Sequence, residues 1–236
     1  MLKNLSIKKK IIILFILISI IPLIIVSYIN NRQTVKLLDD ITENKINRGQ
    51  NIAKYVLDDN KKDALLIAKR YLNNEELISL FKNKNRDKLD KKLEPIYNSL
   101  HKNEGITVFE FGKKNGVVFT RGHHPGKYGD DKSDNESIQR ALKGQEVAGF
   151  EFGKSGLAVR AFVPIKDNGE VIGTLQVGYN LNQDMLKDIK KLIPGGIAFY
   201  QKDKLIQSSN ENEQDQIGNE IKDKSIYDRL KMVKKL

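Results

Sequence analysis

The residues best suited to bind a ligand lie in two stretches of the chain that are rich in apolar residues and glycine. Arg121, His123 and His124 lie in the first, TRGHHP, and Arg160 lies in the second, GLAVRAFVPI. Both arginines sit in or at the end of segments typical of β-strands, so their charges lie on half-buried backbone. Burying a cation is costly unless an anion meets it. We therefore interpret the two stretches as parts of one anion-binding site.

Arginine suits this role because its planar guanidinium donates paired hydrogen bonds to a carboxylate or a phosphate. The alternative is an internal ion pair with a nearby acid, for which the candidates are Asp130, Asp131 and Glu151. Two arginines on separate strands, with histidines in the adjoining loop, favour the ligand. Phe162 follows Arg160 by two residues, so both point to the same face of one strand. Phe162 should therefore line the pocket if Arg160 faces it.

Metal binding and catalysis find weaker support. A metal site needs three or four converging ligands, and adjacent histidines of an extended chain point to opposite sides. His101 is the only other histidine, and cysteine is absent. No serine lies in a nucleophile context, and no carboxylate is evidently placed to orient a histidine. Glu110 and Glu151 could be paired acids, but exposed strand positions explain them equally well. We expect no enzyme activity, no metal and no cofactor.

The overall charge raises the question of nucleic-acid binding. The chain carries 41 lysines and arginines against 30 acidic residues, a net charge of +11. The lysines are scattered among acids, and there is no arginine-rich run with interleaved aromatic residues, which would be typical of a nucleic-acid interface. We therefore expect no nucleic acid among the partners.

The N-terminal segment is typical of a membrane anchor. Residues 11–29 read IIILFILISIIPLIIVSYI, nineteen residues without a charge, and about 20 apolar residues suffice for a helix to cross a bilayer. Lys8, Lys9 and Lys10 precede this run, so the positive-inside rule places residues 1–10 in the cytoplasm and the chain after Asn30 outside. A cleaved signal peptide is the alternative, but the run is long and no small-x-small cleavage site follows it. We expect an uncleaved, single-pass anchor.

Residues 30–104 are expected to be helical. From Asn30 to about Arg70 the sequence is polar, lacks proline and carries a narrow stripe of apolar residues at helical spacing. Such a stripe needs a partner helix, from a second copy or from the domain it carries, and we expect a homodimer; a simple amphipathic spacer is the alternative. Asn73 and Asn74 break this helix, and shorter packing helices follow.

From Gly105 the pattern changes to that of strands. Five segments are strand-like and separated by turn residues: 106–111, 117–121, 147–152, 157–165 and 171–179. Between the second and third, Ser133 and Glu136 have the spacing of a capping box that opens a helix ending at Lys143. The pattern predicts an α+β domain at residues 105–181, in which helices pack on an antiparallel five-stranded sheet.

Residues 182–236 look like the start of a second module that is incomplete. We expect a helix from Asn182 to Leu192, a hairpin formed by residues 197–200 and 205–208, and helical, lysine-rich sequence up to Leu236. We therefore expect the chain to be the N-terminal part of a longer receptor.

These residues resemble the extracytoplasmic Cache sensor domains, which are PAS-like. The resemblance covers about Gly105 to Leu181 and rests on RGHHP, a glycine–aspartate loop, a short helix ending in ALKG, and GLAVRAFVPI followed by VIG. It is strongest to the bacterial sensor kinases for fumarate and citrate, which share Arg-x-x-His-Pro and Arg-x-Phe-x-Pro-Ile. The loop from Gly126 to Asp131 departs from that pattern. The continuation after Leu181 is similar to the double-Cache sensors of methyl-accepting chemotaxis receptors.

The resemblance implies ligand binding without turnover. Arg121, His124, Arg160 and Phe162 fall on positions that bind the ligand's carboxylates in that family, whereas His123 has no counterpart. We expect a sensor in the cell membrane that binds a small carboxylate, forms the N-terminal part of a methyl-accepting chemotaxis receptor, and has the lipid bilayer and a second copy as its other partners. The alternatives are the sensor region of a histidine kinase, an anchored extracellular enzyme, and a protein-interaction module.

Overall fold

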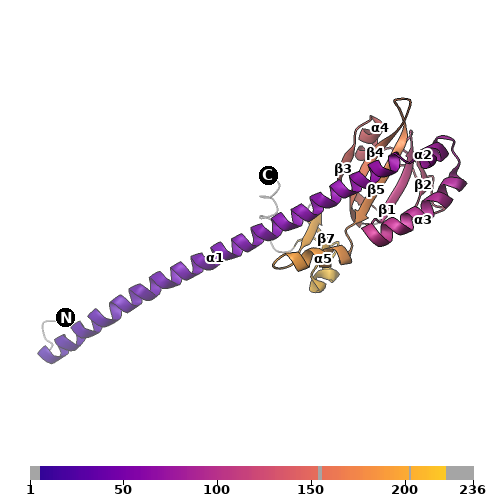
Figure 1. Cartoon of the computed structure of the whole chain (residues 1–236). Helices are drawn as coiled ribbons and strands as arrows, with labels where there is room; N and C mark the ends of the chain where they lie inside the picture. Colours follow the sequence, from indigo (N-terminus) through magenta and orange to yellow (C-terminus); the bar gives the residue numbers. More distant parts are fainter. Residues whose placement is uncertain (1–5, 154–155, 202, 222–236) are drawn as a thin grey trace. The chain divides into compact units, whose positions relative to one another are not determined.

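The computed structural model describes residues 6–153, 156–201 and 203–221, and the chain divides into two compact units. Residues 1–50 form the first unit and residues 51–236 form the second. Helix α1 (Ile7–Leu72) begins in the first unit and ends in the second (Figure 1). The predicted anchor and the polar segment after it are thus both helical.

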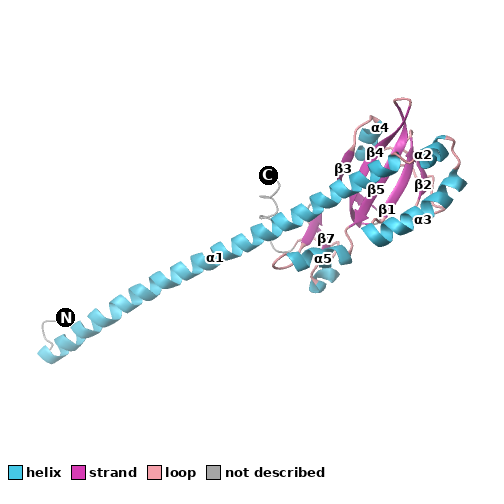
Figure 2. Cartoon of the chain, in the orientation of Figure 1, coloured by secondary structure: helices cyan, strands magenta, loops and turns pink. Residues whose placement is uncertain are grey.

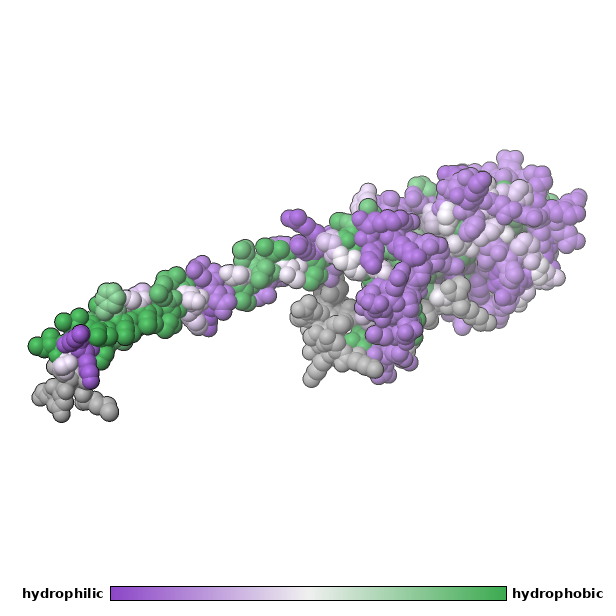
Figure 3. All heavy atoms as spheres, turned by 90° about the horizontal axis from the view of Figure 1, so that it is seen from below, coloured by the Kyte–Doolittle hydropathy of each residue, from purple (hydrophilic) through white to green (hydrophobic). Residues whose placement is uncertain are grey.

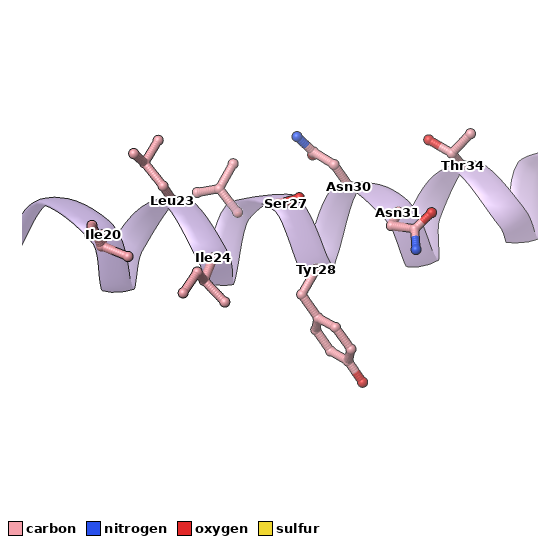
Figure 4. Close-up of a pocket in the computed structure, with 9 residues that line it drawn as sticks. Ile20, Leu23, Ile24, Ser27, Tyr28, Asn30, Asn31 and Thr34 are labelled. Atoms are coloured by element: carbon pink, nitrogen blue, oxygen red, sulfur yellow. The ribbon is translucent and has the colours of Figure 1, made fainter.

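The N-terminal part of α1 has the surface expected of a membrane-spanning helix. Its apolar side chains are exposed (Figure 3), and among the described residues α1 is the one helix long and apolar enough to cross a bilayer. Figure 4 shows apolar side chains up to Ile24 giving way to Asn30 and Asn31. Tyr28 lies at this boundary, and the guanidinium carbon of Arg32 is 5.1 Å from the centre of its ring. Aromatic residues are enriched at membrane–water interfaces, which agrees with an anchor that ends near Ile29.

The second unit contains the predicted antiparallel sheet of five strands (Figure 2). The strands are β1 (Val108–Lys113), β2 (Val118–Arg121), β3 (Val147–Gly153), β4 (Gly156–Asp167) and β5 (Glu170–Asn180). Their order in space is β2-β1-β5-β4-β3. The last strand, β5, therefore lies at the centre, between β1 and β4, and brings together residues that are far apart in the sequence.

One face of the sheet is covered by helices. The end of α1, helix α2 (Glu75–Lys82) and helix α3 (Arg86–Glu104) share a core with strand residues such as Phe109, Phe111 and Leu175, which are fully buried. The predicted break after α1 is confirmed, because the side chain of Asn74 caps α2 by accepting a hydrogen bond from the backbone of Leu77. Bulky alternate residues of the strands face this core, which leaves the other face for a different role.

That other face carries the short helix α4 (Glu136–Leu142). The predicted capping box was wrong: the cap is Asn135, whose side chain accepts from the backbone of Ile138, and Ser133 lies outside the helix. Ser133 instead donates its backbone N–H to the carboxylate of Asp131. Asparagine caps a helix as well as serine does, so the spacing of Ser133 and Glu136 alone could not choose between the two start points.

Beyond the sheet, the described residues contain helix α5 (Gln183–Leu192), the antiparallel pair β6 (Ala198–Gln201) and β7 (Lys204–Ser208), and a short 3-10 helix (Glu211–Gln216). The helix and hairpin predicted for this segment are confirmed. The helical sequence expected near Leu236 lies outside the described residues.

Candidate ligand-binding site

Strand register places three rows of residues on the sheet face opposite the long helices. In an antiparallel sheet, paired residues share a face, and the next residue of that face lies two positions along. The Glu110 row consists of Arg121, Glu110, Gln176 and Phe162. The Arg160 row consists of Val108, Gly178, Arg160 and Gly149. The Glu151 row consists of Asn180, Ala158 and Glu151.

A pocket of about 620 Å³ lies over these rows and is also lined by the loop after β2 and by α4. Arg160 has a glycine as its neighbour on both adjoining strands, Gly178 on β5 and Gly149 on β3. A Cβ atom at Gly178 would lie 3.0 Å from Cγ of Arg160 and 2.3 Å from the carbonyl oxygen of Val159, whereas the space at Gly149 is open. The Arg160 side chain therefore lies close against Gly178, has open space at Gly149, and lines the pocket.

Arg121 lines the same pocket, but its guanidinium is bound by acids of the chain itself. Its Nε donates to Glu110 at 2.7 Å, and its NH2 group lies 2.6 Å from Asp130. Glu110 also accepts from Lys132 at 2.7 Å. Burial alone lowers the pKa of Arg121, but the neighbouring Glu110 and Asp130 outweigh burial and raise that pKa. The internal ion pair with Asp130, weighed from the sequence, is therefore present.

Glu110 is the centre of this network and is not an exposed strand residue. Only 3% of Glu110 is exposed, because it lies between Arg121 and Gln176 in the middle of the sheet. With its amide oriented to suit its neighbours, Gln176 donates to Glu110 at 3.1 Å and accepts from Arg160 at 3.1 Å. Gln176 therefore links the Glu110 row to the Arg160 row.

Arg160 differs from Arg121 in its electrostatic setting. Burial lowers the pKa of its guanidinium, and the attraction of Glu110 and Glu151 opposes this without reversing it. A lowered pKa means that desolvation destabilises the charged guanidinium by more than the nearby acids stabilise it. An additional anion beside Arg160 would therefore be stabilising.

The far end of the pocket offers hydrogen-bond acceptors. Glu151 accepts from the side chains of Asn135 at 2.9 Å and Ser137 at 2.6 Å. The side-chain oxygen of Asn180 is buried and, within the described part of the chain, has no hydrogen-bond donor. A buried acceptor without a protein donor is open to a hydrogen bond from a water molecule or from a ligand.

The two adjacent histidines have different environments. His123 packs its ring beside Tyr97, and its Nδ1 lies 3.1 Å from both the backbone nitrogen and the backbone oxygen of Phe109. Burial lowers the pKa of His123 to about 4, so the ring is neutral at pH 7. His124 is exposed at the pocket mouth. No role was expected for His123. In the structure its ring packs within the folded domain and contacts the backbone of β1.

Phe162 lies in the wall of the pocket, as predicted, but only 1% of it is exposed. It forms a small core with Ile138 and Ala141 of α4 and with Val147 of β3. Its main contacts are therefore with the helix that covers this side of the pocket.

Sequence reasoning missed three residues of the site: Lys132, Gln176 and Asn180. Gln176 and Asn180 alternate with the apolar Leu175 and Val177 of β5, which marks them as facing away from the core. The sequence could therefore have shown which face of β5 these residues lie on. It could not have shown all the residues that lie beside them, because β5 pairs not only with β4 but also with β1, which is distant in the sequence.

The sequence matches, over residues 43–232, the family described as the double sensory domain of two-component sensor kinases (dCache_3). The sensor domain of the histidine kinase DctB from V. cholerae is structurally similar, at 15% identity over 86% of this chain and 77% of that chain, with a TM-score of 0.58. The ligand-binding domain of the Campylobacter jejuni chemoreceptor Tlp3, in complex with 4-methylisoleucine, is similar at 16% identity over 80% of this chain and 75% of that chain, with a TM-score of 0.56.

No curated protein matches the chain. The structural likenesses confirm the expected Cache fold. The family match covers most of the sequence, and the chain therefore belongs to the double Cache sensor family.

Proposed function

We propose that the chain is a membrane-anchored sensor with residues 1–10 in the cytoplasm, whose extracytoplasmic domain at residues 105–181 binds a small carboxylate. The observation that carries this proposal is the setting of Arg160. It lies between two glycines in a pocket, and burial lowers its pKa. A ligand carboxylate would accept charge-assisted hydrogen bonds there, each contributing about 1.5–3 kcal/mol.

The charge balance of the pocket favours a ligand that carries a cationic group as well as the carboxylate. Arg121 is already bound by Glu110 and Asp130, so a second ligand carboxylate would compete with the chain's own acids. Glu151 and the buried oxygen of Asn180 offer acceptors to a ligand ammonium group. An amino acid, which is a zwitterion, could place its carboxylate at Arg160 and its ammonium group at Glu151 and Asn180. A dicarboxylate could use only Arg160.

The four residues expected to bind the ligand take different parts in this proposal. Arg160 contacts the carboxylate directly, and His124 at the pocket mouth donates a further hydrogen bond. Arg121 holds Glu110 in place, and Phe162 forms the apolar wall against α4. Arg121 and Phe162 therefore shape the pocket more than they contact the ligand.

Ligand binding would favour one arrangement of the sensor domain, and a ligand shifts such an equilibrium only by its difference in affinity for the two states. Helix α1, which belongs to both units, is the proposed path to the membrane. We propose the output of a chemotaxis receptor, with a homodimer as the signalling form. A histidine kinase is the alternative output: the description of the matching family names sensor kinases, whereas one of the similar structures is a chemoreceptor domain.

A ligand screen tests the proposal. The full chain, in a nonionic detergent, would be melted with amino acids and with short mono-, di- and tricarboxylates. A ligand of the folded state at 100 times its Kd should add about 2.7 kcal/mol of stability and raise the melting midpoint. We expect an amino acid to give the largest rise. If no carboxylate of any kind raises the midpoint of the folded protein, the proposal is wrong.

A further inference from the structure

A second hollow, of about 590 Å³, is lined by the end of α2, the start of α3 and the turn between β1 and β2, and shares no lining residue with the Arg160 pocket. We call it the basic hollow. Five cations from different segments surround it: Lys82 at the end of α2, Lys84 in the turn, Arg86 at the start of α3, and Lys113 and Lys114 at the end of β1. Its apolar lining comes from Phe81, Phe119 and Ile172.

The charge of the basic hollow is not neutralised by its surroundings. No acidic residue of the described chain lines it. Lys82 pairs with Asp167 outside the hollow at 2.7 Å, and within the described ranges the other four cations form no ion pair. Like charges held this close repel one another, so an anion bound among them would be stabilising.

Arg86 is held rigidly in position. Its guanidinium carbon lies 5.0 Å from the ring centre of Phe119 and 3.6 Å from that of Tyr128, and its Nε donates to the backbone oxygen of Phe119 at 2.9 Å. A guanidinium fixed between two rings loses little conformational entropy when an anion binds it. Immobilisation of this kind distinguishes Arg86 from an ordinary surface arginine.

Lys84 is also placed by the backbone. It has a φ of 56°, in the left-handed region that favours glycine, and its N–H donates to the backbone oxygen of Phe81. A lysine in this conformation is strained, and such positions occur preferentially at functional sites. Glycine is the usual residue at such a position after a helix, so Lys84→Gly would remove the charge and suit the backbone conformation.

We propose that the basic hollow binds a small anion with two or more phosphate groups, independently of the Arg160 pocket. Four cations that pair with no acid of the described residues match a polyvalent anion better than a monovalent one. Lysine ammonium groups serve as point charges for phosphate, and the fixed fork of Arg86 donates to adjacent phosphate oxygens. The apolar lining suits an organic phosphate, with the body of the ligand over Ile172.

The test uses the full chain in a nonionic detergent and inorganic tripolyphosphate as the probe. Calorimetric titrations at constant ionic strength would compare it with phosphate and with sulfate. The double variant Lys84→Gly/Lys113→Ala removes two charges, and glycine at position 84 relieves strain, so folding is preserved. We expect it to bind about tenfold or more weakly, because charge-assisted hydrogen bonds are lost.

Two variants serve as controls. Lys102→Ala/Lys187→Ala changes the net charge equally at exposed sites outside the hollow, and Arg160→Ala alters only the first pocket. Both should bind tripolyphosphate as the unchanged protein does. An equal loss in the Lys102/Lys187 variant would show non-specific attraction and overturn the proposal, as would the absence of any binding. A loss confined to Arg160→Ala would place the anion in the first pocket instead.

Discussion

The positive charges of the two arginines in the pocket have different surroundings. In the Glu110 row, Arg121 is only 7% exposed and is bound by Glu110 and Asp130. In the Arg160 row, glycines flank Arg160 on both neighbouring strands, and burial lowers the pKa of its guanidinium. Acids of the chain thus hold Arg121, which supports folding, whereas burial outweighs the acids near Arg160, so that an added anion would stabilise its charge. We expect substitutions in the Glu110 row to change stability and those in the Arg160 row to change affinity.

The largest effect should follow loss of the central acid. Glu110→Ala would remove the partner that the buried Arg121 shares with the half-buried Lys132, and removal of one member of a buried ion pair costs about 3–5 kcal/mol. Urea unfolding followed by circular dichroism measures this loss. The exposed Glu94→Ala on α3 is the control and should change stability by less than about 0.5 kcal/mol. A similarly small loss of stability for Glu110→Ala would contradict the claim that the Glu110 row stabilises the fold.

Lowering the pH should destabilise the folded domain through protonation of His123. Burial lowers the pKa of this ring to about 4, whereas an unfolded histidine titrates near 6.5, so the unfolded chain binds the extra proton. Stability should therefore fall as the pH decreases from about 6.5 to about 4, by at most about 3 kcal/mol from this group.

The variant His123→Asn isolates that contribution. Its side-chain oxygen can still accept from the backbone of Phe109, yet it does not titrate. The difference in unfolding free energy between the unchanged protein and the variant should shrink or change sign as the pH falls through this range. A difference that stays constant with pH would contradict a buried, neutral His123.

A smaller effect should appear in ligand preference. Glu110→Gln keeps the size of the side chain but removes the charge that holds Arg121 and Lys132. Those cations would then accept a second ligand carboxylate, so dicarboxylates should gain about tenfold in affinity over amino acids, or about 1.4 kcal/mol. Titration of both ligand classes into both proteins measures the change. An unaltered preference would show that Glu110 does not select the ligand's charge.

Much of the fold could be predicted from local sequence. Alternating apolar residues and glycine turns gave all five strands within a few residues, and polar breaks such as Asn73–Asn74 gave the helix ends. The capping box was wrong because Ser133 and Asn135 are both good caps. The predicted site residues Arg121, His124, Arg160 and Phe162 do line one pocket.

The partners within the pocket could not be predicted, and the reason is physical. Glu110 meets Gln176 only because β5 inserts between β1 and β4, which local patterns do not encode. The sequence therefore suggested that both arginines bind the ligand. The register shows that one of them already has an acid of the chain as its partner.

The most direct test of this account compares Arg160→Ala with Arg140→Ala by calorimetric titration of the best ligand from the screen. Arg140 is an exposed arginine on α4, outside the pocket lining, so its loss controls for net charge. We predict that Arg160→Ala weakens binding by about tenfold to a hundredfold, since charge-assisted hydrogen bonds of about 1.5–3 kcal/mol are lost, while Arg140→Ala binds normally. Equal affinity in the two variants would contradict the central claim that Arg160 receives the ligand's carboxylate.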